Sequence, residues 1–259
     1  MCALIGAAAP AGDLASRSRG AVALDGLAEN RVVDPRGSPP PLHPWNLSLR
    51  EARSWQIALR GRLILEWSGA PPRSVAGIDV HYEKGLGRAA IVVLSYPGLA
   101  LCHEEILQGE VPFPYIPGLL AFREGPLVLG VCRRLPSLPD VLLFDGHGVA
   151  HPLGFGLASH LGLWMDRPSI GVAKSRLYGR YQPPGPDFGD VSVLQDEHSP
   201  EVLVGAVVRT RAGAKPVFVS PGHRMSLDDA IGITLACCCG HRLPEPLWLA
   251  DRLARRPVG

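Results

Sequence analysis

A short apolar run that ends at an acidic residue constrains this chain more than any other feature. The residues of Val141–Phe144 are all apolar, and Asp145 and the glycine-rich segment Gly146–Gly148 follow them directly. Such a run is typical of a strand that is buried on both faces of a sheet covered by helices. The carboxyl end of a buried strand opens into the crevice where α/β proteins place their sites. The pattern therefore predicts Asp145 at a strand tip, although a simple Asp-Gly turn is an alternative interpretation.

The segments around this strand predict a mixed sheet. Three strand-like runs precede it, and the connections between them are so short that they allow only antiparallel neighbours. After it, a helix over residues 156–164 and a second short apolar strand, Ser169–Ser175, complete a right-handed parallel βαβ unit. We therefore expect an α/β fold whose central sheet is an antiparallel meander followed by parallel strands, flanked by helices. The meander strands are predicted over Val75–Tyr82, Ala89–Tyr96 and Leu99–Leu107.

Helix signals lie on both sides of the predicted sheet. Ser48 and Glu51 form a capping box that begins a helix, and Pro71–Pro72 is expected to end it. A second helix is predicted over residues 119–135, and Ser226 is expected to cap a third. The remaining predicted elements are strands over Val191–Gln195, Val202–Thr210 and Pro216–Ser220 and a terminal helix that ends at Arg255–Arg256.

Composition bounds the organisation of the chain. With 259 residues, 46% of them hydrophobic, the chain can bury one full core. Residues 1–45 are rich in small residues and prolines and are expected to form a disordered extension, which leaves residues 46–259 as a single domain. A net charge of +2 permits a polyanionic partner but does not argue for one. Without a long apolar run or a signal peptide, we expect a cytoplasmic protein with no membrane partner and no obligate protein partner.

Two carboxylates are expected to meet at one edge of the sheet. Asp79 stands in the middle of the first meander strand, which in such sheets commonly lies beside the strand that ends at Asp145. Two neighbouring carboxylates repel each other unless a cation is present. Hard oxygen ligands without a matching His/Cys set favour Mg²⁺ or Mn²⁺ over zinc. Glu124, on a helix across the crevice, could complete the cluster, and such clusters cut or transfer phosphoryl groups.

Two basic side chains accompany the predicted acids. Lys174 ends the second parallel strand, beside Asp145, and could neutralise charge that develops on a phosphate, although an ordinary surface lysine is the alternative. His151 could shuttle a proton or contact phosphate. His147 and His151 are four residues apart, but Pro152 and the nearby glycines argue against a zinc-binding helix.

A stiff, proline-rich loop forms another candidate site. Tyr115 and Ile116 stand between Pro114 and Pro117, and the fixed φ of the prolines holds this segment rigid. A rigid exposed aromatic ring can stack on a base or insert into a base step. The alternative is that Tyr115 caps the core and that the prolines only shape a linker.

Five strings of the sequence resemble the endonuclease V family, in order and at similar spacing. The resemblance covers about residues 48–251, and its Pro-Tyr-Ile-Pro string is highly specific. It implies an RNase H-like fold and an enzyme of the bacterial type. Such an enzyme nicks DNA that contains deaminated adenine (deoxyinosine) at the second phosphodiester bond 3′ to the lesion. The alternatives are an inosine-specific endoribonuclease on single-stranded RNA, a lesion-binding module and a general RNase H-like nuclease. The strings are Val75–Val80, Pro114–Glu124, Asp145–Pro152, Gly171–Ser175 and Gly222–Leu227.

The resemblance also implies roles for the acidic residues. Asp79 and Asp145 would bind Mg²⁺, with Mn²⁺ as a possible substitute, and Glu124 would be the third acid. Asp251 falls where bacterial relatives can carry His and animal relatives carry Asp. No ligand role is assigned to Asp251.

The same resemblance implies contacts to nucleic acid. The segment Pro114–Pro117 would form a wedge beside a base that is flipped out of the duplex. Gly118 and Gly148 would line the base pocket through backbone groups. His151 and Lys174 match positions implicated in catalysis or phosphate contact. The expected partner is damaged DNA containing deoxyinosine, with inosine-containing RNA as the alternative.

Overall fold

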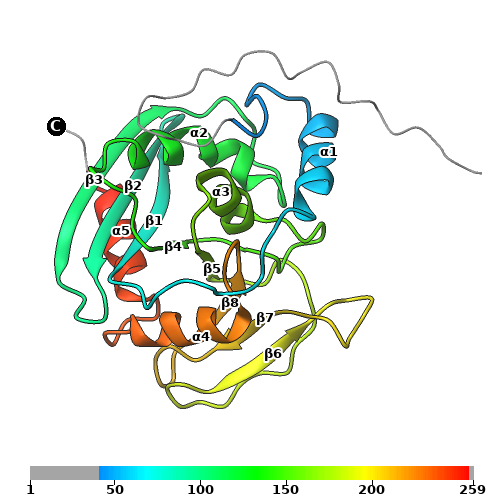
Figure 1. The fold of residues 1–259 in the computed structure, drawn as a ribbon, viewed down its shortest axis with the longest axis vertical. Helices are drawn as coiled ribbons and strands as arrows, with labels where there is room; N and C mark the ends of the chain where they lie inside the picture. Colours follow the sequence, from blue (N-terminus) through cyan, green and yellow to red (C-terminus); the bar gives the residue numbers. More distant parts are fainter. Residues whose placement is uncertain (1–40, 257–259) are drawn as a thin grey trace, which may run out of the picture. The chain divides into compact units, whose positions relative to one another are not determined.

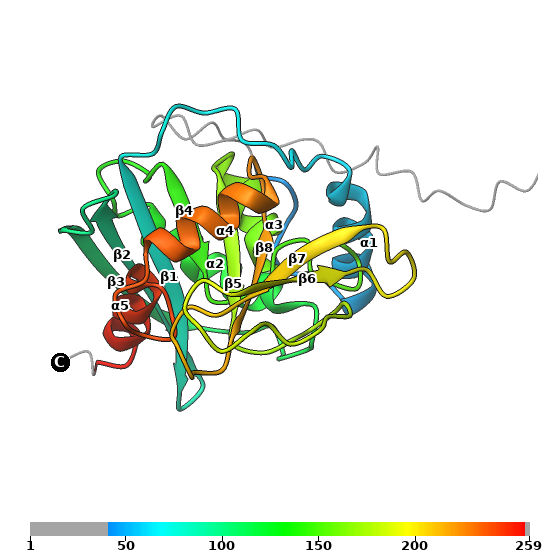
Figure 2. The same cartoon turned by 90° about the horizontal axis from the view of Figure 1, so that it is seen from below.

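An eight-stranded sheet forms the centre of the structure, with the strand order β3-β2-β1-β4-β5-β8-β7-β6 (Figures 1 and 2). The computed structural model describes residues 41–256. Residues 1–40 of the predicted extension therefore lie outside the described residues. The strands are β1 Ser74–Glu83, β2 Leu86–Ser95, β3 Leu101–Glu110, β4 Val141–Phe144, β5 Ser169–Ala173, β6 Val191–Gln195, β7 Leu203–Val208 and β8 Val217–Pro221.

The strand pairing confirms the predicted fold class. Strands β1, β2 and β3 form an antiparallel meander, and β1 also pairs in parallel with β4. Strand β4 pairs in parallel with β5, as the predicted βαβ unit requires. Beyond β5 the sheet continues with the antiparallel strands β8, β7 and β6. The register sets Ile78 of β1 opposite Phe144 of β4, so the residues that follow them lie at the same edge of the sheet.

Helices cover both faces of the sheet because the central strands alternate their side chains between two cores. Ile78 and Phe144 pack with α2 and α3, whereas Val75 and Leu143 pack with α4 and α5. None of the helices in the described part of the chain is long and apolar enough to cross a membrane. The helices are α1 Leu49–Arg60, α2 Leu120–Cys132, α3 Leu157–Met165, α4 Leu227–Ala236 and α5 Glu245–Ala254.

Helix α1 begins as predicted but ends early. The amide of Glu51 donates to the Ser48 hydroxyl, and the Glu51 carboxylate accepts from the Ser48 amide at 2.8 Å, so the capping box is present. The predicted end at Pro71–Pro72 is wrong, because the helix stops at Arg60 and Gly61 is its C-cap. Glycine is a poor helix former, and it ends the helix well before the prolines.

The segment just before α1 is packed, although it falls within the predicted extension. The ring of Trp45 stacks on Trp164 of α3 with 4.5 Å between centroids. His43 lies in the same aromatic cluster, and its Nε2 is 2.7 Å from Nε2 of His160. Residues 42–45 therefore contribute side chains to the core of the domain.

Candidate active site

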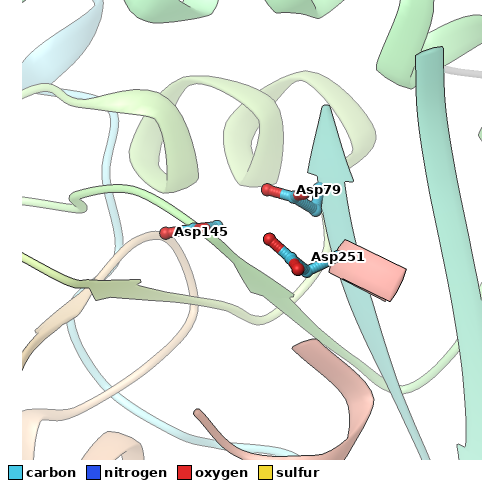
Figure 3. Close-up of side chains that lie close together, drawn as sticks. All are labelled: Asp79, Asp145 and Asp251. Atoms are coloured by element: carbon cyan, nitrogen blue, oxygen red, sulfur yellow. The ribbon is translucent and has the colours of Figure 1, made fainter. Parts of the chain in front are cut away.

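Three carboxylates from three different elements gather at the edge of the sheet (Figure 3). Asp79 lies on β1, Asp145 directly follows β4 and Asp251 lies on α5. One oxygen from each of the three lies within 4.8 Å of the other two. The sequence predicted that Asp79 and Asp145 would be neighbours, and the parallel pairing of β1 with β4 brings them together. The amide of Asp145 donates to the carbonyl of Ile78 at 3.2 Å, which fixes this edge.

Close packing of α5 on β1 places the third carboxylate, Asp251, beside the other two. A Cβ at Gly77 would lie 2.1 Å from the backbone of Pro246, so only glycine lets the helix approach this closely. Asp251 lies on the same face of α5 as the buried residues Leu247 and Ala250. Sequence reasoning gave Asp251 no ligand role. An acidic residue on the apolar stripe of the terminal helix was the signal that could have identified it.

The cluster carries strong electrostatic repulsion. Burial and the charge of Asp145 raise the pKa of Asp79 to about 7. Lys174 lies beside Asp145, as predicted, and its Nζ is 2.5 Å from Oδ2 of Asp145 and 3.4 Å from Oδ1 of Asp251. Arg255 donates to both oxygens of Asp251, at 2.9 and 3.0 Å. These hydrogen bonds hold the pKa of Asp251 below its usual range.

Glu124 lies outside this group of three. Its side chain is 7% exposed, and its Oε1 accepts a hydrogen bond of 2.9 Å from the hydroxyl of Tyr82. Burial, together with the charges of Asp79 and Asp145, raises the pKa of Glu124 to about 8. The charges of these two aspartates act on Glu124, so the acid lies near the cluster. Its role as a third acid stays a prediction.

A pocket adjoins the acidic cluster. Gly118, one of the two predicted pocket glycines, lines it and has a left-handed backbone with φ +85°. Gly148 instead packs against β8, where an added Cβ would lie 1.9 Å from the carbonyl oxygen of Pro221. Three leucines and an alanine supply the apolar side chains of the lining. The lining residues are Gln56, Gly118, Leu120, Ala121, Gly146, His147, His151, Gly156, Leu157 and Leu177.

His151 uses both ring nitrogens in hydrogen bonds. Because a carbonyl oxygen only accepts, Nε2 of His151 must donate to the carbonyl of Gly118, at 2.8 Å. Nδ1 accepts from the amide of Leu153 at 3.0 Å. Burial lowers the pKa of His151. Gln56 also donates to the Gly118 carbonyl, at 2.8 Å, so His151 and Gln56 together fix this side of the pocket. The predicted catalytic role of His151 remains a prediction.

The proline-rich loop presents one aromatic ring to solvent. Tyr115 is 69% exposed, whereas Ile116 packs partly on Phe113 and Phe122. Arg123 of α2 anchors the loop, since its Nη1 donates to the carbonyl of Phe113 at 2.5 Å. The exposed ring and the anchored backbone are the features that a wedge needs, and the wedge itself stays a prediction.

Comparisons with known proteins agree on one family. A family model described as Endonuclease V matches residues 57–252. Endonuclease V from Alkalilimnicola ehrlichii is 46% identical over 216 residues, which cover 82% of this chain and 94% of the relative. The crystal structure of Endonuclease V from Streptomyces avermitilis is similar with a TM-score of 0.76 and 46% identity, covering 82% of this chain and 93% of that chain.

A further solved structure contains nucleic acid. It is Endonuclease V from Ciona intestinalis in complex with a 24mer DNA containing an inosine followed by a ribo-adenosine. Its TM-score is 0.69 and its identity is 29%, over 80% of this chain and 96% of that chain. The stretch that the family model matches contains Asp79, Asp145 and Asp251.

Proposed function

The chain belongs to the endonuclease V family, and from this we propose that it is a Mg²⁺-dependent repair endonuclease. It recognises deaminated adenine (deoxyinosine) in DNA and hydrolyses the second phosphodiester bond on the 3′ side of the lesion. The observation that supports this most is the group Asp79, Asp145 and Asp251 beside Lys174 and next to a pocket.

The three carboxylates fit a divalent cation. Asp79, Asp145 and Asp251 offer only hard oxygen donors, which suit Mg²⁺, and Mn²⁺ accepts the same donors. The raised pKa of Asp79 reflects burial and repulsion, and a cation would relieve the repulsion. When bound, the cation supplies water activation and stabilises negative charge on the phosphate. Glu124, which the sequence predicted as the acid that joins Asp79 and Asp145, remains a candidate beside Asp251, because burial raises its pKa and the charges of both aspartates raise it as well.

The chain's own side chains would then orient and neutralise the substrate. Lys174 spans Asp145 and Asp251, and from there its ammonium group would compensate charge on the scissile phosphate. The pocket beside the cluster would hold the flipped base between apolar side chains. Tyr115 would stack beside the gap that the base leaves. His151 would keep the Gly118 wall of the pocket in position.

Nicking assays on a panel of duplexes test this function. We expect the wild-type protein to nick inosine-containing DNA in Mg²⁺ and to leave undamaged and mismatched DNA and RNA–DNA hybrids largely intact. Asp79→Ala and Asp145→Ala should abolish nicking because each removes one of the clustered carboxylates. Asp228→Ala, which removes an exposed acid on α4, is the matched control and should leave nicking unchanged. Retained nicking in the first two variants contradicts the metal assignment.

An inosine-specific endoribonuclease is the second candidate. One observation favours it: the Ciona relative was solved with a ribo-adenosine after the inosine. The family resemblance also implies that animal relatives carry Asp at the position of Asp251. Side-by-side nicking rates on inosine-containing single-stranded RNA and on deoxyinosine-containing DNA decide between the two. A faster rate on RNA would replace the first proposal.

A further inference from the structure

Arg255 binds both oxygens of one carboxylate of the acidic cluster. Its Nε lies 2.9 Å from Oδ2 of Asp251, and its Nη2 lies 3.0 Å from Oδ1. Arg255 is the C-cap of α5, four residues after Asp251, so the two side chains lie on the same face of the helix. Two N–H groups of one guanidinium on the two oxygens of one carboxylate form a bidentate pair, which fixes the orientation of the carboxylate.

The guanidinium occupies the side of Asp251 that a chelated cation would use. A carboxylate offers about four lone-pair sites, two on each oxygen. A bidentate guanidinium and a chelated metal ion both use the two sites that converge between the oxygens. Arg255 takes these two sites, and Lys174 approaches Oδ1 from elsewhere, at 3.4 Å. Asp251 is therefore restricted to binding a cation through a single oxygen.

Divalent cations differ in what this restriction costs them. Mg²⁺ is small, demands near-ideal octahedral geometry and is usually bound by one or two carboxylates, and Mn²⁺ shares the octahedral preference. Ca²⁺ is larger, takes more oxygen ligands and readily accepts both oxygens of one carboxylate. A carboxylate that is barred from chelation therefore weakens the binding of Ca²⁺ more than the binding of Mg²⁺ or Mn²⁺.

We propose that Arg255 is a positioning residue that limits Asp251 to one-oxygen coordination and so makes the acidic cluster select Mg²⁺ and Mn²⁺ over Ca²⁺. The proposal rests on the proposed function, because the cluster must hold a divalent cation, and extends it to the choice of ion. The alternative is an exposed ion pair that only supports the end of α5. Such pairs contribute little to stability, and support of this kind does not change which ion binds.

Two variants of Arg255 separate the effect of the bidentate pair from the effect of charge. Arg255→Met removes both donors and the charge, whereas Arg255→Lys keeps the charge but lacks the two parallel donors. Arg252→Met is the matched control, because it removes another guanidinium from α5, one that lies 4.6 Å from the centroid of the Trp248 ring. Isothermal titration calorimetry on the chelator-treated full chain gives the Kd for Mn²⁺ and for Ca²⁺. The Tm in EDTA verifies that each variant is folded.

Selection through Arg255 predicts that the ratio of the Kd for Ca²⁺ to the Kd for Mn²⁺ falls roughly tenfold in both Arg255 variants. Arg252→Met should keep the wild-type ratio. An unchanged ratio in both Arg255 variants overturns the proposal and leaves the proposed function intact. A ratio that changes in Arg255→Met but not in Arg255→Lys assigns the effect to charge and also overturns it. A wild-type protein that binds neither ion overturns this proposal together with the metal dependence of the proposed function.

Discussion

At the scale of single residues, the repulsion between the clustered carboxylates destabilises the folded protein when no cation is bound. The pKa of Asp79 is raised from 3.8 to about 7 by burial and by the charge of Asp145. Because this folded-state pKa lies above the unfolded value, the folded state binds the Asp79 proton more tightly. Stability is therefore full below the unfolded pKa and falls as the pH rises through about 7.

Neutralising Asp79 should consequently stabilise the metal-free protein while it removes metal binding. Above pH 7 we expect Asp79→Asn to raise the Tm in EDTA by about 2–4 °C, corresponding to ~1 kcal/mol for a domain of this size. The increase in Tm that Mg²⁺ gives the wild-type protein should disappear in the variant. Differential scanning calorimetry measures both effects. Asp228→Asn serves as the control, and a lower Tm for Asp79→Asn would contradict the repulsion.

At the scale of elements, the first turns of α2 support two parts of the site. Arg123 anchors the proline-rich loop through the Phe113 carbonyl, and its guanidinium lies 4.4 Å from the centroid of the Tyr82 ring. The Tyr82 hydroxyl in turn donates to Glu124. Arg123 therefore holds the loop that carries Tyr115, and its neighbour on α2, Glu124, is held by Tyr82.

Removing the exposed ring on this loop should weaken nucleic-acid binding and leave the fold unchanged. Tyr115 is 69% exposed, so Tyr115→Ala loses little packing. Loss of base stacking of about 1–3 kcal/mol per base predicts a rise of roughly tenfold in the Kd for inosine-containing duplex. Anisotropy titrations and Tm values check this prediction. Phe188→Ala removes another exposed ring, 55% exposed, and equal losses in the two variants would rule out a specific wedge.

The elements differ in how far their sequences determine them. Strand β4 was predicted with its observed bounds, because a run buried on both faces is apolar at every position. The end of α1 was missed, because Gly61 ends the helix well before the Pro71–Pro72 pair that was expected to end it. The neighbours Asp79 and Asp145 followed from strand order. The burial of Glu124 depends on tertiary packing, which local patterns do not encode. Asp251 lies on the apolar stripe of the terminal helix, and this local pattern could have identified it.

At the scale of the whole domain, a buried pair of histidines joins the segment before α1 to α3. Nδ1 of His43 must donate to the carbonyl of Pro44, at 2.8 Å, so its Nε2 accepts from Nε2 of His160. The pair lies among Trp45, Phe122 and other aromatic rings. Burial lowers the pKa of His43 to about 4 and the pKa of His160 well below its usual value.

This pair should make the stability of the domain depend on pH. The folded-state pKa of His43 lies below the unfolded value of 6.5, so its contribution is complete above pH 6.5 and is lost as the pH falls toward about 4. His43→Phe should flatten the pH dependence of the unfolding free energy in this range, by up to about 1.4 kcal/mol per pH unit. Urea unfolding between pH 4.5 and 8 measures it. The exposed His198, changed to Gln, is the control, and an unchanged slope in His43→Phe would exclude the pair as its source.

The close packing of α5 on Gly77 has a consequence for when the site forms during synthesis. Asp79 lies on β1 and Asp145 directly follows β4, whereas Asp251 lies on the last helix that the structure describes. A ribosome-bound chain that has already formed the central strands still lacks Asp251, the third carboxylate of the acidic cluster. The three carboxylates meet only after every other element has been made and the final helix has docked. An unfinished or truncated chain could therefore form the central sheet but would lack the complete group of three carboxylates.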